Sequence, residues 1–242
     1  MATLVIATKN EGKAREYRKM FAPFGIEVKT LADFPSFTIN EDGKTFEENA
    51  VIKAKTAVDH LHLPVMADDS GLCVDALNGA PGVHSARYAG DHDDAANNAK
   101  LLKELANVPD ERRTAHFHTT IVALKPDGAK LVTNGRVNGR ILKQPRGENG
   151  FGYDPLFMPD EYQERSMAEL TANQKNQISH RGRALRAFMD KFTGWWQAWP
   201  KHWSLVIIMV TARFLRQLLT VGKIRWTCWS TAVIQKLALM TR

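Results

Sequence analysis

The sequence is poor in cysteine and has no apolar run long enough to cross a membrane. Its two cysteines, Cys73 and Cys228, lie far apart and lack the spacing of a metal site. This argues against a disulfide framework, so we expect a reducing compartment, the cytoplasm. The apolar run at residues 205–210 falls short of the roughly 20 residues that a membrane-spanning helix needs. The first residues lack a basic segment and a long apolar one, so we predict a strand there and no secretion signal.

Acidic residues are missing from the C-terminal part of the chain, and this part accounts for the net charge of +7. Residues 194–242 contain seven basic residues, no acid and all six tryptophans. Setting those seven aside leaves 26 of the 33 basic residues against 26 acidic ones, so residues 1–193 are formally neutral. We therefore predict a domain over 1–193 that binds neither nucleic acid nor membrane, followed by a basic, tryptophan-rich extension over 194–242.

Two interpretations of the extension stay open. Its tryptophans and basic side chains could bind a membrane surface. Alternatively, it is a non-native extension, such as out-of-frame coding sequence, because the change in composition is abrupt. We favour the second interpretation and expect poor order there, since isolated termini seldom pack.

Residues 1–193 have the strand and helix patterns of an α/β domain. An apolar fraction of 44% and a charged fraction of 24% over the whole chain are ordinary for a globular protein with a buried core. Short apolar runs predict strands, and apolar residues three or four apart predict amphipathic helices. The predicted strands cover residues 3–8, 26–28, 64–67, 114–125 and 130–137, and the predicted helices cover 14–24, 46–61, 94–106 and 171–192.

The connection between the first strand and the first helix is a candidate phosphate site. Asn10 is a plausible N-cap for this helix. A helix N-terminus presents free N–H groups and the positive end of the helix dipole, both of which favour a phosphate. Lys13 would add a full charge one turn into the helix. The spacing is not that of a P-loop, and an ordinary capped helix with solvated lysines is the alternative.

Residues 66–72, Met-Ala-Asp-Asp-Ser-Gly-Leu, are the stretch around which the domain is organised. Successive side chains of a strand point to opposite faces, so Asp68 and Asp69 can enter one cleft only if the backbone turns. Gly71 permits such a turn before the chain continues extended at residues 72–74. We predict that one aspartate serves a hard metal ion or a water and that the other braces the loop. A polar turn without chemistry is the alternative.

Two features flank this stretch. The polar loop at residues 35–44 leads into a capping-box pattern, with Thr45 as the cap and Glu48 as its partner. His116 and His118 share one face of a predicted strand. Without a third ligand in reach, they indicate a polar strand face more than a metal site.

Polar residues gather again in two later stretches. Residues 150–155, Gly-Phe-Gly-Tyr-Asp-Pro, set Phe151 between two glycines, where its ring could stack on a base or could plug the core beneath it. A second capping-box pattern at residues 171–174 opens the last predicted helix. Polar first turns before an apolar stripe are typical of a helix that borders a cleft.

Six motifs, taken together and in this order, resemble one known family. They are residues 8–13, 45–50 followed by 53–54, 67–72, 79–82 with 85–88, 150–155 and 179–182. Over residues 1–193 the chain resembles the noncanonical purine nucleoside triphosphate pyrophosphatases, also called the inosine triphosphatase or Ham1-like family, and it is close to the bacterial members.

The resemblance implies a fold, an activity and a set of site residues. It implies a mixed, elongated α/β sheet with flanking helices in two lobes around a central cleft, and a homodimer. It implies hydrolysis of ITP, dITP and XTP to the monophosphate and pyrophosphate, with Mg²⁺ as cofactor. Asp69 matches the proton acceptor, and Glu41 and Asp69 match the metal-side carboxylates. The residues that match substrate contacts are Thr8, Lys9, Asn10, Glu11, Gly12, Lys13, Lys53, Ser70, Phe151, Gly152, Tyr153, Asp154, Lys175, His180 and Arg181.

This chemistry agrees with the residue types. Cleavage of a triphosphate needs charge neutralisation more than covalent chemistry, and two acids plus phosphate oxygens suffice for Mg²⁺. Arg181 and His180 are donors that would favour the 6-keto edge of hypoxanthine or xanthine over the amino group of adenine. Two alternatives are a hydrolase of modified pyrimidine triphosphates and a non-catalytic nucleotide- or RNA-binding module.

Overall fold

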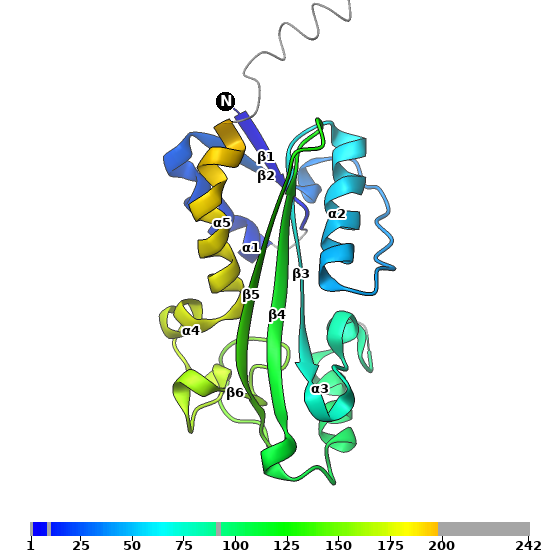
Figure 1. Ribbon diagram of the computed structural model, residues 1–242, viewed down its shortest axis with the longest axis vertical. Helices are drawn as coiled ribbons and strands as arrows, with labels where there is room; N and C mark the ends of the chain where they lie inside the picture. The colour runs from blue at the N-terminus through cyan, green and yellow to red at the C-terminus, as the bar shows by residue number, and fades with distance from the viewer. Residues whose placement is uncertain (1, 9–10, 91–92, 198–242) are drawn as a thin grey trace, which may run out of the picture. The chain divides into compact units, whose positions relative to one another are not determined.

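The structure is a computed structural model that describes residues 2–8, 11–90 and 93–197, with residues 11–13 and 16 described by their backbone alone. Six strands form a single sheet (Figure 1). The strands are β1 (Ala2–Ile6), β2 (Ile26–Thr30), β3 (Val65–Val74), β4 (Thr114–Leu124), β5 (Lys130–Ile141) and β6 (Phe157–Pro159).

Five α-helices accompany this sheet in the described part of the chain. Helices α1 and α5 cover one face of the sheet and α2 covers the other, while α3 lies toward the far end of the long strands (Figure 1). The helices are α1 (Glu11–Phe21), α2 (Phe46–Leu61), α3 (Asp94–Glu104), α4 (Ala172–Ile178) and α5 (His180–Gln197).

The sheet is mixed, as predicted. Its strand order is β2-β1-β3-β4-β5-β6, in which β1 runs parallel to β2 and β3 and the other neighbours are antiparallel. The pairing of β3 with β4 is unbroken from Val65 opposite Leu124 to Val74 opposite Ala115. The fold class expected from the sequence, a mixed α/β sheet with flanking helices, is confirmed.

The buried apolar side chains form three clusters. Two lie on opposite faces of the sheet near β1, one under α1 and α5 and the other under α2. The third lies at the far end of β3, β4 and β5, where Leu72, Phe117 and Val137 pack with Leu101 of α3 and with Phe157. The three long strands therefore belong to both ends of the domain.

The predicted turn at Gly71 is wrong, because β3 remains extended from Val65 to Val74. The glycine is needed for close packing. A Cβ on Gly71 would lie 2.3 Å from the carbonyl oxygen of Gly82 and 2.6 Å from Oγ of Ser85. Asp68 and Asp69 consequently point to opposite faces of the sheet, as in any extended strand.

The last predicted helix is interrupted, so the expectation of one helix over 171–192 is also wrong. Ser179 has an extended backbone (φ −60°, ψ 151°) between α4 and α5. Its Oγ accepts a hydrogen bond of 3.1 Å from the backbone N–H of Gly182, so Ser179 caps α5. The predicted capping box of Thr171 with Gln174 is confirmed at the start of α4. The break places His180 and Arg181 in the first turn of α5.

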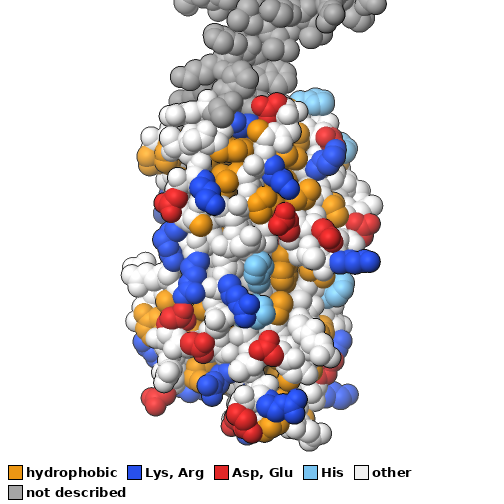
Figure 2. All heavy atoms as spheres, viewed as in Figure 1, with side chains coloured by type: hydrophobic (Ala, Val, Ile, Leu, Met, Phe, Trp, Pro, Cys, Tyr) orange, Lys and Arg blue, Asp and Glu red, His pale blue; other side chains and the backbone are white. Residues whose placement is uncertain are grey.

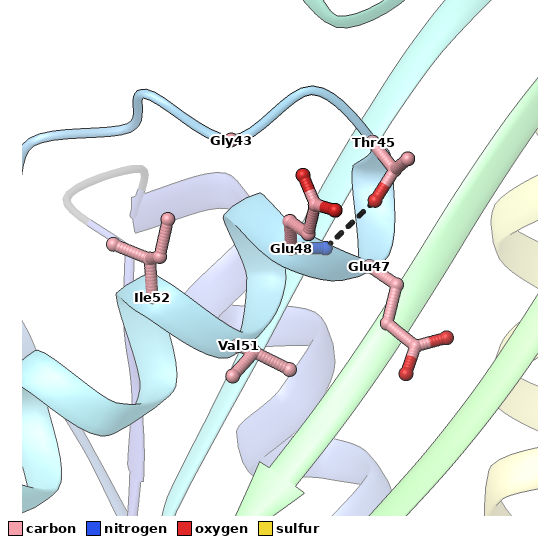
Figure 3. Close-up of a pocket in the computed structure, with 6 residues that line it drawn as sticks. All are labelled: Gly43, Thr45, Glu47, Glu48, Val51 and Ile52. Carbon is pink, nitrogen blue, oxygen red and sulfur yellow. Dashed lines mark hydrogen bonds between the residues drawn. The ribbon is translucent and has the colours of Figure 1, made fainter.

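The other predicted capping box is formed only in part. Oγ1 of Thr45 accepts from the backbone N–H of Glu48 at 3.1 Å (Figure 3). The Glu48 carboxylate instead accepts from the backbone N–H of Lys44 at 2.7 Å, which ties the preceding loop to the helix. A surface hollow of about 490 Å³ lies at this helix start, lined by Gly43, Thr45, Glu47, Glu48, Val51 and Ile52.

The chain divides into two units, Met1–Trp196 and Gln197–Arg242. Helix α5 continues past residue 194, and Trp195 and Trp196 pack against Phe192 in the core. The predictions for the extension from residue 198 onward lie outside the described residues. Among the helices that are described, none is long and apolar enough to span a bilayer. Acidic and basic side chains are interspersed over the face shown in Figure 2.

Candidate active site

An open stretch of the β3 edge is the centre of the candidate site. Among the described residues, strand β1 pairs with β3 only at Val65 and Met66, and the backbone N–H of Ala7 makes the last contact, 2.8 Å from the Met66 oxygen. Beyond that point the described part of the chain supplies a strand, β4, on one side of β3. The next acceptor along β3, the Asp68 carbonyl oxygen, accepts from Nζ of Lys53 on α2 at 3.0 Å. Because the edge is open, side chains from both faces of β3 can border the same space.

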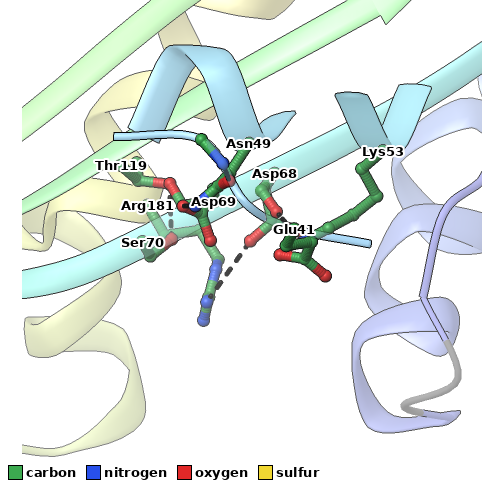
Figure 4. A network of polar contacts seen from close by, with 9 residues as sticks. Glu41, Asn49, Lys53, Asp68, Asp69, Ser70, Thr119 and Arg181 are labelled. Atoms are coloured by element: carbon green, nitrogen blue, oxygen red, sulfur yellow. Dashed lines mark hydrogen bonds and ion pairs between the residues drawn. The ribbon is translucent and has the colours of Figure 1, made fainter. Parts of the chain in front are cut away.

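Acidic side chains from two segments meet beside this edge (Figure 4). Glu41, in the loop before α2, lies 2.9 Å from Nζ of Lys53 through its Oε2. Asp69, on β3, accepts a hydrogen bond of 3.2 Å from Nδ2 of Asn49. Asn49 and Lys53 are one helical turn apart on α2, so the two acids are held by neighbouring positions of one helix.

Burial raises the pKa of Asp69 to about 6. Lys53 and the hydrogen bond from Asn49 act in the opposite direction, while the charges of Glu41 and Asp68 raise the pKa further. A buried carboxylate whose pKa is raised by neighbouring negative charges marks a place where a cation is favourable.

The donor set of Glu41 and Asp69 fits a hard divalent cation. Carboxylate oxygens are the ligands that Mg²⁺ prefers, and this ion usually keeps several waters and takes substrate phosphate oxygens. Within residues 2–8, 11–90 and 93–197, no three His, Cys, Asp or Glu side chains converge as a metal site. Two protein carboxylates with substrate oxygens are therefore the arrangement that the site could offer.

Asp68 connects this acidic group to the other half of the site. Its carboxylate lies 3.6 Å from Nη2 of Arg181, and both side chains are largely buried, with 7% and 20% of their surface exposed. Asp68 therefore braces a helix, whereas the sequence predicted that one aspartate braces the loop. On the same face of β3, the hydroxyls of Ser70 and Thr119 are 2.6 Å apart.

The glycine-flanked Phe151 lies among cationic side chains. Its ring is 62% exposed, so it does not plug the core. Nζ of Lys175 lies 4.8 Å from the ring centroid, and Cζ of Arg181 lies 6.0 Å from it. Lys175 also pairs with the buried carboxylate of Asp154, which accepts from the Phe151 backbone N–H at 2.9 Å. An exposed ring with two neighbouring cations is a surface on which a flat, polar base could stack.

His180 is neutral at physiological pH. Burial, with help from the charges of Arg181 and Lys175, lowers its pKa to about 3. Its ring stacks on Phe117 with centroids 4.9 Å apart. Nδ1 of His180 and Nε of Arg181 are buried and have no hydrogen-bond partner within the described part of the protein. Two orphaned ring and guanidinium nitrogens on one helix turn are expected where a ligand completes the hydrogen bonding.

Helix α3 fixes the backbone beside Phe151. The Gly152 N–H donates to Asp94 at 2.6 Å, and the Gly152 carbonyl accepts from Nδ2 of Asn98 at 2.9 Å. The Tyr153 side chain is buried and donates to the Ser85 carbonyl at 2.9 Å, so its hydroxyl is used inside the protein. Sequence reasoning gave Asp94 and Asn98 no role, and their spacing of four on a helix is the only sign of a shared function.

The predicted phosphate-binding segment is described only in part. Thr8 follows β1, and its carbonyl accepts from the Leu31 N–H at 3.3 Å. Lys9 and Asn10, including the predicted N-cap, lie outside the described residues. The backbone of Glu11, Gly12 and Lys13 forms the first turn of α1. The helix therefore begins five residues after the end of β1.

The predicted polar face at His116 and His118 is observed. The His118 ring stacks on Phe46 at 5.2 Å, and its Nε2 lies 3.3 Å from both Thr120 and Asn134. Burial lowers the pKa of both histidines.

Sequence and structure comparisons identify relatives over most of the domain. A family model described as the Ham1 family matches residues 4–191. A dITP/XTP pyrophosphatase of Lactiplantibacillus plantarum is 65% identical over 195 residues, which are 80% of this chain and 96% of the relative. A dITP/XTP pyrophosphatase of Bacillus cereus is 51% identical over 199 residues, 81% of this chain and 97% of the relative.

Solved structures agree with the sequence relatives. The Staphylococcus aureus Ham1 protein superposes with a TM-score of 0.75 at 42% identity, covering 79% of this chain and 98% of its own. A HAM1 protein from Coxiella burnetii superposes with a TM-score of 0.76 at 41% identity, covering 80% of this chain and 100% of its own.

Proposed function

The chain belongs to the Ham1 family, and from that membership we propose that it hydrolyses ITP, dITP and XTP to the monophosphate and pyrophosphate. Cleavage would fall between the α and β phosphates and would remove these nucleotides from the cellular pool. The observation that carries the proposal is that two neighbouring residues of β3 connect the acidic side chains with the residues around Phe151. Asp69 lies with Glu41 and Lys53, while its neighbour Asp68 pairs with Arg181 beside Phe151.

The half of the site around Glu41 and Asp69 would hold Mg²⁺ and the triphosphate. Glu41 and Asp69 would be the protein ligands of the ion, which when bound would neutralise phosphate charge. Lys53 and Lys13 would pair with phosphate oxygens, and residues 8–13 would wrap the triphosphate. Asp69 would accept the proton of the attacking water, a role suited to a carboxyl whose pKa of about 6 lies close to physiological pH.

The half of the site around Phe151 and Arg181 would recognise the base. Phe151 would stack on the purine, with Gly152, Tyr153 and Asp154 shaping the loop around it. Arg181 and neutral His180 would donate to the 6-keto oxygen of hypoxanthine or xanthine. The amino group of adenine would instead face those donors with another donor, which costs a few kcal/mol when buried. Lys175 and Ser70 would add polar contacts.

The test is a product-resolved assay of the full-length chain with Mg²⁺. We expect pyrophosphate from ITP, dITP and XTP, and little product from ATP. Asp69→Asn should lower kcat by about 10²- to 10⁴-fold while the protein stays folded. Asp59→Asn is the matched control, because that carboxylate is exposed on α2 and pairs only with Lys55 among the described contacts. Inorganic phosphate as the sole product, or equal rates with ATP, would contradict the proposal.

Names of the relatives favour purine over pyrimidine substrates. A homodimer and a cytoplasmic location follow from the family resemblance and from the sparse cysteines, and they are part of the proposal. Light scattering on the purified protein tests the dimer, with a monomer at micromolar concentration as the contrary result.

A further inference from the structure

Asn49 is a buried polar residue on the face of α2 that otherwise packs against the sheet with alanines. Only 1% of its surface is exposed, and it is buried together with Ala50 and Ala54 of the same helix. A buried amide is costly unless its donors and acceptors are paired. Here Nδ2 donates to Asp69 at 3.2 Å, and Oδ1 accepts from the Gly43 backbone N–H at 2.8 Å.

The Gly43 contact fixes the loop that carries Glu41. Residues 35–45 have no regular secondary structure, so side chains of α2 hold them in place. The Phe37 ring stacks on His60 at 4.5 Å, and Glu41 pairs with Lys53. At Gly43 the backbone lies so close that an added Cβ would be 2.7 Å from Oδ1 of Asn49. Asn49 therefore holds the loop at Gly43, two residues after Glu41.

The Asp69 contact orients a carboxylate without neutralising it. A lysine or arginine at position 49 would form an ion pair and compete with any bound cation. An amide donates one hydrogen bond and leaves the negative charge and the second oxygen of the carboxylate available. Partners of this kind, which orient the ligands of a metal site, typically change metal affinity or activity by 10- to 100-fold when mutated.

We propose that Asn49 is a positioning residue that holds the Asp69 carboxylate and the Glu41 loop at a fixed spacing for one divalent cation. The expected effect on turnover rests on the proposed function, whereas the expected effect on cation binding rests on the contacts described above. The oxygen and the nitrogen of a single side-chain amide span the two segments that supply the acids. Losing that side chain separates the segments and leaves each acid individually intact.

Asn97 offers a matched control. It is also buried on a helix, with 2% exposed, and it also holds a loop through both ends of its amide. Its Oδ1 accepts from Ala89 at 2.6 Å, and its Nδ2 donates to the Ala86 carbonyl at 3.3 Å. No carboxylate takes part in these contacts, so Asn97 has the structural role without the acid.

The experiment compares Asn49→Ala and the near-isosteric Asn49→Leu with Asn97→Ala and Asn97→Leu in the full-length protein. The Mn²⁺ dissociation constant is measured by electron paramagnetic resonance in the presence of the α,β-methylene analogue of ITP, which resists hydrolysis. We expect the Mn²⁺ dissociation constant of both Asn49 variants to rise about 10-fold or more. Thermal unfolding should show similar losses for both sites, while the Asn97 variants keep the wild-type Mn²⁺ affinity.

Turnover of ITP with Mg²⁺ provides the second measurement. For the Asn49 variants we expect kcat to fall about 10- to 100-fold and KM for ITP to change less than about 3-fold, because the base-side residues are untouched. The inference is overturned if the Asn49 and Asn97 variants bind Mn²⁺ alike, or if the wild type binds it no more tightly than Asn49→Ala. A wild type that releases no pyrophosphate would instead overturn the proposed function, since Mn²⁺ binding is measured without turnover.

Discussion

Replacing Asp69 by asparagine should stabilise the metal-free protein while lowering kcat by about 10²- to 10⁴-fold. Burial raises the pKa of this carboxyl from its ordinary value of 3.8 to about 6. The folded state therefore binds more protons than the unfolded state between about pH 4 and 6, and the free energy of unfolding falls as pH rises through that window. Above pH 6 the protein carries the full cost of a buried charge. Asparagine at this position has no charge and can still accept from Asn49.

The magnitude follows from the size of the pKa change. Each tenfold change in an ionisation equilibrium is worth about 1.4 kcal/mol, so the full cost is about 3 kcal/mol. Because Asp69 keeps some contact with solvent, we expect about 1 to 2 kcal/mol of it to appear. For a chain of this size that corresponds to an increase in Tm of about 3 to 6 °C at pH 8.

Thermal unfolding with EDTA at pH 8 and at pH 4 measures the effect. The gain of Asp69→Asn should be present at pH 8 and absent at pH 4, where the wild-type carboxyl is protonated. Adding Mg²⁺ at pH 8 should stabilise the wild type and leave the variant unchanged. The adjacent Asp68→Asn is the control of opposite sign, because it removes the partner of Arg181 and should cost at least about 1 kcal/mol. A gain that persists at pH 4, or equal changes in the two variants, would refute the reasoning.

Three further predictions concern other parts of the site. Phe151→Ala should raise KM for ITP about 5- to 100-fold with little change in Tm, because the ring is 62% exposed and a base stack is worth about 1 to 3 kcal/mol; an unchanged KM would remove its stacking role. His180→Phe should keep the stack on Phe117 and remove the loss of stability that the wild type shows as pH falls from 6.5 toward 3. Unfolding at pH 7, 5 and 4 measures this, and parallel curves for the two proteins would contradict it. Gly135→Ala should lower the free energy of unfolding by about 1 to 3 kcal/mol or more, since its Cβ would lie 1.9 Å from the His180 carbonyl, whereas Gly194→Ala, with nothing within 4 Å, should raise it by about 0.5 to 1 kcal/mol.

Periodicity predicted the elements of the domain because their apolar faces are local patterns. The alanines of α2 and the apolar stripe of α5 recur at helical spacing, and the long strands β4 and β5 flank an evident turn at residues 126–129. The fold class followed from these elements and from the family resemblance. The confirmed capping box at Thr171 is likewise a pattern of four adjacent residues.

The two errors have different causes. Gly71 suggested a turn because glycine permits one, but its lack of a side chain serves the approach of Gly82, eleven residues away. The break at Ser179 was missed because the polar residues on both sides of it show no change of pattern, while its serine caps a new helix. The local sequence shows which conformations and contacts a residue permits, and the packed structure determines which of them is adopted.

The site was predicted as a list of residues and not as an arrangement. The motifs contained Asp68, Asp69 and Arg181, yet their spacing in sequence could not indicate that Asp69 faces α2 while its neighbour Asp68 faces α5. Asn49 belongs to a motif that the sequence displayed, but its contacts lie 6 and 20 residues away. Sites that depend on such separations appear only after the chain has folded.

The length of β3, β4 and β5 determines how this protein can close around a ligand. These strands run without interruption through both ends of the domain, so the ends are not joined by a linker about which they could swivel. A change in the angle between the two ends would therefore require the strands themselves to flex. At about 3.3 Å per residue, half of an 11-residue strand is about 18 Å long, and a bend of about 5° at its middle moves the tip by about 1.5 Å. Asp69 lies opposite Thr120, near that middle, where such a bend would displace it least.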